Sequence, residues 1–149
     1  MLKKYKLGFD IGAFGLFLAI MIPNFYWCCV EAPHDVLRNE SMTPVIDMVA
    51  SIFQVIMVVA LCLIQRKDVG RRGVTAKTVG MLVCYIIYVI AWILYYQGDT
   101  GAMVIVLLCV APCVAFGFYA IDRKNYLALL PLGVFGVCHL VFGVVNFIV

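Results

Sequence analysis

Residues 78–97 and 102–121 read TVGMLVCYIIYVIAWILYYQ and AMVIVLLCVAPCVAFGFYAI, with only GDTG between them. Neither stretch contains a charged residue, and each is as long as the roughly 20 residues that a helix needs to cross a bilayer core. The apolar residues run without the alternation of a barrel strand, and only helices or closed barrels satisfy every backbone polar group in lipid. This pair of stretches therefore predicts a transmembrane helical hairpin.

Three further stretches have the same character, so the whole chain is predicted to be one all-α, polytopic membrane domain. The composition agrees, because 66% of the 149 residues are apolar and only 13% are charged, more apolar surface than a soluble domain of this size hides. The connections are short, which predicts antiparallel packing of neighbouring helices and leaves no room for a soluble catalytic domain. The five predicted transmembrane helices span about residues 7–27, 45–64, 78–97, 102–121 and 127–149.

The basic residues lie on one side of this predicted bundle. Three lysines precede the first helix, five basic residues lie between the second and third helices, and two lie between the fourth and fifth. Of the 11 Lys and Arg residues, only Arg38 lies on the other side. The positive-inside rule then predicts a cytoplasmic N-terminus and an outside C-terminus. The basic runs have no interleaved aromatics, so nucleic acid is not expected as a partner.

Small residues form stripes at helical spacing on three of the predicted helices. In lipid, such stripes let helix backbones approach closely. Two interpretations stay open: packing within the bundle, or contact with a second copy or with a partner subunit. The stripes are Gly8, Gly12, Gly15 and Ala19 on the first helix, Cys109, Cys113 and Gly117 on the fourth, and Gly133, Gly136 and Gly143 on the fifth.

Polar residues inside the second and fifth helices share one face of each helix. At 1.5 Å per residue, Gln54 and His139 lie near the bilayer midplane, whereas Asp47 lies close to the outer surface. An ionisable group in a membrane is costly to bury and is by default a candidate site. Two alternatives stay open: Asp47 caps the start of its helix or lies exposed at the rim, and His139 hydrogen-bonds a neighbouring helix.

The third helix adds an aromatic stripe. Tyr95 and Tyr96 fall at the outer interface, where an aromatic belt is expected, whereas Tyr88 and Trp92 lie deeper and form either core or a ligand platform. We predict that these polar and aromatic side chains form a track leading inward from the outside. The candidate ligand-binding residues are Asn24, Asp47, Ser51, Gln54, Tyr88, Trp92, His139 and Asn146.

Nothing in the sequence predicts an enzyme. The seven cysteines form no C-x-x-C pair, and the two histidines lie at different depths, so we expect no catalytic residues, no metal site and no cofactor. The sequence favours a small membrane protein that binds or transports an amphipathic small molecule or lipid through an outward-facing pocket. The alternative is a non-catalytic subunit of a larger membrane complex. The expected partners are membrane lipids, an amphipathic small molecule, and a second copy or a membrane partner subunit.

Short motifs also carry a resemblance. The first predicted helix ends in Ile22-Pro23-Asn24, and the fifth carries Cys138-His139 followed by Asn146. In these residues the chain resembles a set of small, uncharacterised five-helix bacterial membrane proteins, over most of its length. The resemblance implies a multi-pass protein of the bacterial cytoplasmic membrane and no known activity.

Overall fold

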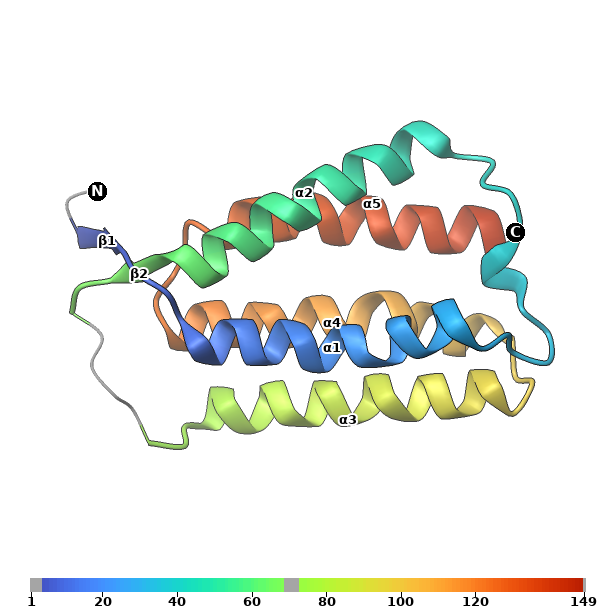
Figure 1. Ribbon diagram of the computed structural model, residues 1–149, viewed down its shortest axis with the longest axis horizontal. Helices are drawn as coiled ribbons and strands as arrows, with labels where there is room; N and C mark the ends of the chain where they lie inside the picture. The colour runs from blue at the N-terminus through green and yellow to red at the C-terminus, as the bar shows by residue number, and fades with distance from the viewer. Residues whose placement is uncertain (1–3, 69–72, 149) are drawn as a thin grey trace.

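Five helices in the described part of the chain are long and apolar enough to cross a membrane. The structure is a computed structural model that describes residues 4–68 and 73–148. The prediction of an all-α chain with five such helices is confirmed (Figure 1). They are α1 (Ile11–Cys29), α2 (Pro44–Leu63), α3 (Ala76–Tyr96), α4 (Ala102–Asp122) and α5 (Leu129–Phe147). Lys3, Arg71, Arg72 and Val149, which the predicted topology also uses, lie outside the described residues.

The start of α1 is the largest error in the predicted helix bounds. Leu7 belongs to strand β1 (Tyr5–Leu7), which pairs antiparallel with β2 (Ile64–Arg66). The helix begins only after Asp10, whose Oδ1 accepts hydrogen bonds from the backbone N–H groups of Gly12 at 3.0 Å and Ala13 at 3.1 Å. Asp10 is thus an N-cap, a residue type that satisfies free N–H groups at a helix start.

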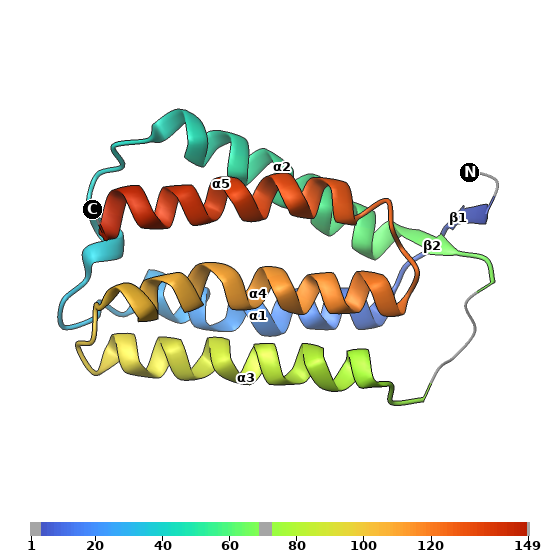
Figure 2. The same ribbon diagram turned by 180° about the vertical axis from the view of Figure 1, so that it is seen from behind.

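Helix α4 forms the centre of the bundle. In its most apolar window 56% of the residues are buried, against at most 28% in any other helix. It packs between α3 and α5, and α2 packs on the far side of α5 (Figures 1 and 2). Helix α1 contacts α2, α3 and α4.

One expectation about packing is wrong. Short connections predicted that successive helices lie side by side, but α2 and α3 lie at opposite edges of the bundle in both views (Figures 1 and 2). The connection from residue 64 to residue 75 is long enough to allow this, because a chain can span up to about 3.3 Å per residue. The connections on either side of α4 are shorter, and there the expected antiparallel neighbours are found.

The two ends of the bundle differ. At the end where β1 and β2 lie, here called the ribbon end, α1 and α2 are joined by backbone hydrogen bonds from Gly8 N to Leu63 O and from Asp10 N to Cys62 O. The Asn125 side chain, in the turn before α5, donates to Ala60 O and Ile64 O at 2.9 and 2.8 Å. At the opposite end, here called the C-terminal end, α2 diverges from α1 (Figure 1).

The small-residue stripes of α4 and α5 pack against each other. A Cβ built on Gly143 would lie 2.6 Å from Cys109 Sγ, and one on Gly136 would lie 3.7 Å from Cys113 Sγ. These two glycines therefore serve packing within the bundle, as one of the two interpretations predicted. A Cβ built on Gly15 or Gly133 would have no described atom of another part of the chain within 4 Å, so these two glycines are not needed for packing within the bundle.

Candidate functional site

A cavity of about 610 Å³ reaches the C-terminal end of the bundle, where Asn39, Ser41 and Phe147 contribute to its lining. Its lining comes from all five helices and from the connection between α1 and α2. The volume falls within the range of small-molecule binding sites, which are mostly apolar with a few polar groups. The apolar part of the wall includes Ile105, Leu108, Phe116, Phe135, Phe142 and Phe147.

Most of the side chains proposed from the sequence meet at this cavity. Six of the eight line it: Asn24, Asp47, Gln54, Tyr88, Trp92 and His139. The structure thus brings together residues from α1, α2, α3 and α5 that are far apart in the chain. Their role in ligand binding stays a prediction.

The other two proposed residues do not line the cavity. Ser51 is exposed on α2, because a helix turns about 100° per residue and Ser51 is therefore rotated by about 60° from Gln54. Asn146 joins α5 to the connection before α2, with its Nδ2 donating to Thr43 Oγ1 at 2.7 Å and to Phe142 O at 2.8 Å. Its Oδ1 accepts from Met42 N, so this amide holds the rim of the cavity in place.

One wall of the cavity is fixed by a hydrogen-bonded pair between α1 and α3. Asn24 Nδ2 donates to the Tyr88 hydroxyl at 2.7 Å and to Ile20 O at 3.0 Å. The Tyr88 hydroxyl donates in turn to Ile20 O at 3.2 Å. Because buried polar groups are costly unless paired, this pair sets the separation of α1 and α3 beside the cavity.

Trp92 lies one helical turn after Tyr88, and the two rings meet edge to face. Trp92 is only 6% exposed, and its indole N–H makes no hydrogen bond of good geometry with a described residue, although it interacts with the Tyr88 hydroxyl. That hydroxyl also donates to Ile20 O and accepts from Asn24 Nδ2. A bound molecule that offered a well-aligned oxygen acceptor would satisfy the Trp92 N–H better.

Asp47 and His139 are the acidic residue and the histidine among the described lining residues. Asp47 is exposed in the first turn of α2, which fits the alternative of a residue at the rim, and it forms no ion pair or side-chain hydrogen bond with a described residue. The His139 ring stacks on Phe135 at a centroid distance of 5.0 Å and lies within electrostatic range of Asp47. No Lys or Arg in the described part of the chain contributes to the lining.

Sequence reasoning missed the side chain that organises the rim, Asp35. Its Oδ1 accepts from Trp27 Nε1 and from the Tyr95 hydroxyl, both at 2.8 Å, and its Oδ2 accepts from Arg38 Nε at 2.7 Å. Partial burial opposes ionisation of this carboxylate, but the hydrogen bonds from Trp27, Arg38 and Tyr95 outweigh it and lower the pKa of Asp35. The one local sign of this role in the sequence was Arg38, three residues after Asp35. The other partners, Trp27 and Tyr95, belong to helices and are further away in the chain.

The same contacts correct the expectation for Tyr95. It was assigned to an aromatic belt at the membrane interface, but its side chain is fully buried. Besides donating to Asp35, its hydroxyl accepts from Leu37 N at 3.1 Å. Tyr95 therefore ties the connection between α1 and α2 to the end of α3.

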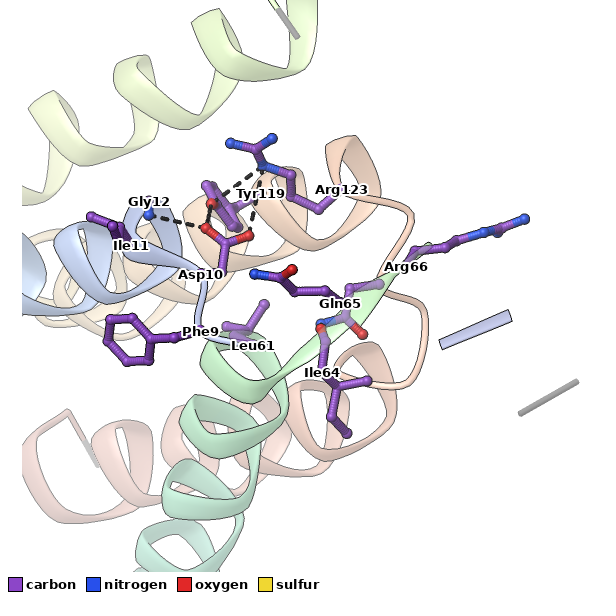
Figure 3. A pocket seen from close by; sticks show the side chains of 11 residues that line it. Phe9, Asp10, Ile11, Gly12, Leu61, Ile64, Gln65, Arg66, Tyr119 and Arg123 are labelled. Atoms are coloured by element: carbon purple, nitrogen blue, oxygen red, sulfur yellow. Dashed lines mark hydrogen bonds and ion pairs between the residues drawn. The ribbon is translucent and has the colours of Figure 1, made fainter. Parts of the chain in front are cut away.

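A second, smaller pocket of about 290 Å³ lies at the ribbon end (Figure 3). There the Tyr119 hydroxyl donates to Asp10 Oδ1 at 2.7 Å, and Arg123 Nε lies 3.9 Å from Asp10 Oδ2. Arg123 Nε also donates to the Tyr119 hydroxyl at 3.3 Å. These contacts join the start of α1 to the end of α4, and the sequence analysis singled out none of the three residues. We call this group the Asp10 latch.

Within residues 4–68 and 73–148, no group of three His, Cys, Asp or Glu side chains is placed to hold a metal ion.

Compared with known protein families, curated proteins and solved structures, the chain shows no match. The resemblance described from the sequence therefore rests on its motifs alone. The function has to be argued from the cavity and its lining.

Proposed function

We propose that the chain is a multi-pass protein of a cell membrane, with the ribbon end in the cytoplasm and the C-terminal end outside. The support comes from the outer surface of α3, which is apolar. Its exposed residues include Val79, Val83, Ile86, Ile90 and Ile93. Such a continuous apolar stripe is unfavourable in water. Apart from Arg38, the described basic residues of the connections lie at the ribbon end, as the positive-inside rule requires for a cytoplasmic side.

We propose further that the cavity binds an amphipathic small molecule or lipid, which reaches it from the outside. The observation that carries this proposal is a cavity of about 610 Å³ with a largely apolar wall, in which the Trp92 N–H is incompletely satisfied. An apolar wall favours a chain or ring, while the Trp92 N–H and the amides of Asn24 and Gln54 favour a polar group. Transport would follow if the Asp10 latch opened while the rim closed.

The alternative of an interaction subunit gains no support from the α5 stripe. Gly136 and Gly143 are covered by Cys113 and Cys109 of α4, so that face is not available to a partner.

Fluorescence of Trp92 tests the binding proposal. A Trp27→Phe variant leaves Trp92 as the sole tryptophan, and Asp35 keeps its bonds to Tyr95 and Arg38. The variant is placed in lipid nanodiscs and titrated with cationic, neutral and anionic amphiphiles that share an alkyl chain of about 12 carbons, so that they differ only in the charge of the headgroup. We expect a saturable change in Trp92 emission with at least one of them.

A matched reporter separates binding from partition into the bilayer. In the Trp27→Phe/Trp92→Phe background, Ile86→Trp places the fluorophore on the exposed face of α3, away from the cavity. Its emission should change without saturation. If Trp92 emission also changes without saturation for all three amphiphiles, the cavity is not a binding site and the proposal is wrong.

A further inference from the structure

The pocket at the ribbon end extends from a buried amide to exposed apolar side chains. Asn125 is 2% exposed and is the most buried of the described lining residues, whereas Phe9 and Ile11 of the same lining are 55% and 77% exposed. Apolar side chains that project from a protein are unfavourable in water and favourable against lipid tails. The mouth of this pocket is therefore next to lipid.

Asn125 presents an acceptor that the described part of the chain leaves unsatisfied. Its Nδ2 donates to Ala60 O at 2.9 Å and to Ile64 O at 2.8 Å, which fixes the orientation of the amide. Its buried Oδ1 has no hydrogen-bond partner among the described residues. Buried polar atoms of proteins are almost always satisfied by protein, water or ligand, because an unpaired one is costly. The pocket is therefore suited to a molecule that brings a donor to Asn125.

Asp10 adds a second acceptor to the pocket. Its Oδ1 already accepts from Gly12 N, Ala13 N and the Tyr119 hydroxyl. Its Oδ2 lies 3.9 Å from Arg123 Nε, which is within range of an ion pair but too far for a hydrogen bond. The second carboxylate oxygen can therefore accept from a charged donor, and such bonds are the strong ones.

Backbone contacts hold Asp10 and Asn125 close together. Asp10 N donates to Cys62 O at 2.8 Å, and the Asn125 side chain donates to the carbonyl groups of Ala60 and Ile64, two residues to either side of Cys62. Both residues therefore rest on the end of α2.

Gln65 supplies a third polar group. Its side chain extends from β2 toward Asp10 (Figure 3), and its amide makes no hydrogen bond with a described residue. The pocket thus offers three oxygen acceptors, from Asp10, Gln65 and Asn125. A primary ammonium has three N–H donors, whereas a trimethylated ammonium has none.

Arg123 is the cation beside Asp10 in this pocket. Its Nε donates to the Tyr119 hydroxyl at 3.3 Å and lies 3.9 Å from Asp10 Oδ2. Arg66 also lines the pocket, but it pairs with Asp68 at 2.7 Å and extends away from Asp10 (Figure 3). One negative and one positive charge therefore lie close together. A headgroup with an ammonium and a phosphate a few bonds apart complements both charges, whereas one with a single charge complements only one.

We infer that the ribbon-end pocket binds a zwitterionic phospholipid with a primary ammonium, the chemistry of phosphatidylethanolamine. The ammonium donates to the three oxygen acceptors, the phosphate pairs with the Arg123 guanidinium, and the acyl chains lie against Phe9 and Ile11. This site is at the opposite end of the bundle from the cavity of the proposed function, and it does not depend on what that cavity binds.

Native mass spectrometry of the full chain in a neutral detergent tests the inference with three lipids that carry identical acyl chains. Phosphatidylethanolamine has the primary ammonium, phosphatidylcholine has methyl groups in place of the N–H donors, and phosphatidylglycerol has hydroxyl groups and a net negative charge. We expect phosphatidylethanolamine to bind about tenfold more tightly than either of the others, as for lost hydrogen bonds to a charged group. Soluble glycerophosphoethanolamine, which has the headgroup without the chains, should not displace it at equal concentration.

Two variants and a control assign the selectivity to its residues. Asp10→Asn retains an oxygen for the N-cap and for Tyr119, because Asn is also a good N-cap, but it removes the charge and the second acceptor. It should abolish the preference for phosphatidylethanolamine over phosphatidylcholine. Asp68→Asn makes the same charge change at an exposed residue outside the lining and should leave the preference intact. Gln65→Leu breaks no hydrogen bond between described residues, and it should weaken phosphatidylethanolamine binding several-fold while leaving phosphatidylcholine unchanged.

The outcomes separate this site from the other proposals. Equal binding of phosphatidylethanolamine and phosphatidylcholine, or equal effects of Asp10→Asn and Asp68→Asn, would overturn the inference and assign the Asn125 acceptor to bound water. Displacement by glycerophosphoethanolamine at equal concentration would show that the pocket takes a soluble ligand and would overturn the lipid assignment. None of these results bears on the cavity at the C-terminal end, so the proposed function fails or stands separately.

Discussion

The Tyr95 hydroxyl donates a hydrogen bond of 2.8 Å to Asp35 Oδ1, although the two residues are 60 positions apart in the chain. The same hydroxyl accepts from Leu37 N at 3.1 Å. One buried side chain at the end of α3 thus holds both a carboxylate and a backbone N–H of the connection between α1 and α2. That connection also contributes Leu37, Asn39 and Ser41 to the cavity wall, so the rim of the cavity depends on this contact.

Tyr95→Phe is expected to lower stability by about 1–3 kcal/mol, because Asp35 and the Leu37 N–H each lose a partner in a partly buried place. Thermal unfolding of the purified protein in detergent measures the effect. Tyr85→Phe is the matched control, since Tyr85 lies on the same helix and is half-buried without a hydrogen bond to its hydroxyl among the described residues. Equal unfolding temperatures for the two variants would contradict the role assigned to Tyr95.

The Asp35 carboxylate should also make stability depend on pH. Its pKa is lowered from the ordinary value of 3.8, so the folded state favours the ionised form. The stabilisation is therefore fully present above pH 3.8 and is lost as the pH falls below that value through the lower pKa of the folded state. The difference in unfolding temperature between the wild type and Asp35→Asn should be constant near neutral pH and shrink below pH 3.8. A difference that persists unchanged in strong acid would show that the charge of Asp35 plays no part.

Much of the fold follows from the sequence for a simple physical reason. Each crossing of a bilayer demands about 20 apolar residues in one helix, and that demand is visible in an isolated segment. Pairing between distant segments is not. Leu7 looks like the start of an apolar helix, yet it pairs with Ile64 in a strand, and no local feature of Leu7 announces its partner.

The candidate site divides in the same way. Depth along a helix located Gln54 and His139, because depth depends only on position within a span. Rotation about the helix axis decided against Ser51, and a step of about 60° was enough to turn it out of the cavity. Asp10 and Asp35 were missed because each accepts a hydrogen bond from a tyrosine that is distant in the chain. Tyr119 donates to Asp10 and Tyr95 donates to Asp35.

The Asp10 latch should keep the ribbon end closed. Asp10→Ala removes the N-cap of α1 and the acceptor of the Tyr119 hydroxyl, and the expected loss of stability is about 2 kcal/mol or more. The Cys62 thiol is buried directly beside this contact, since Asp10 N donates to Cys62 O at 2.8 Å. Maleimide labelling of a variant that retains only Cys62 should therefore accelerate when Asp10 is replaced.

Asp68→Ala is the control for that experiment. Asp68 pairs with Arg66 at the same end of the bundle, but it is exposed and lies outside the latch. Its replacement should leave the labelling rate of Cys62 unchanged. A similar acceleration in both variants would mean that loss of any acidic side chain at the ribbon end loosens it.

The midplane polar residues of the cavity give the last prediction. Gln54→Leu and His139→Ala should each weaken the saturable binding seen at Trp92 several-fold, by about 1 kcal/mol for a lost polar or ring contact. Insertion and purification should be normal, because neither side chain makes a hydrogen bond to another described residue. Ser51→Leu is the matched control on α2: it removes a polar group less than one helical turn from Gln54 but outside the lining. Ser51 is exposed and does not line the cavity. If Ser51→Leu weakened binding as much as Gln54→Leu, the ligand would therefore bind the exposed face of α2 and not the cavity.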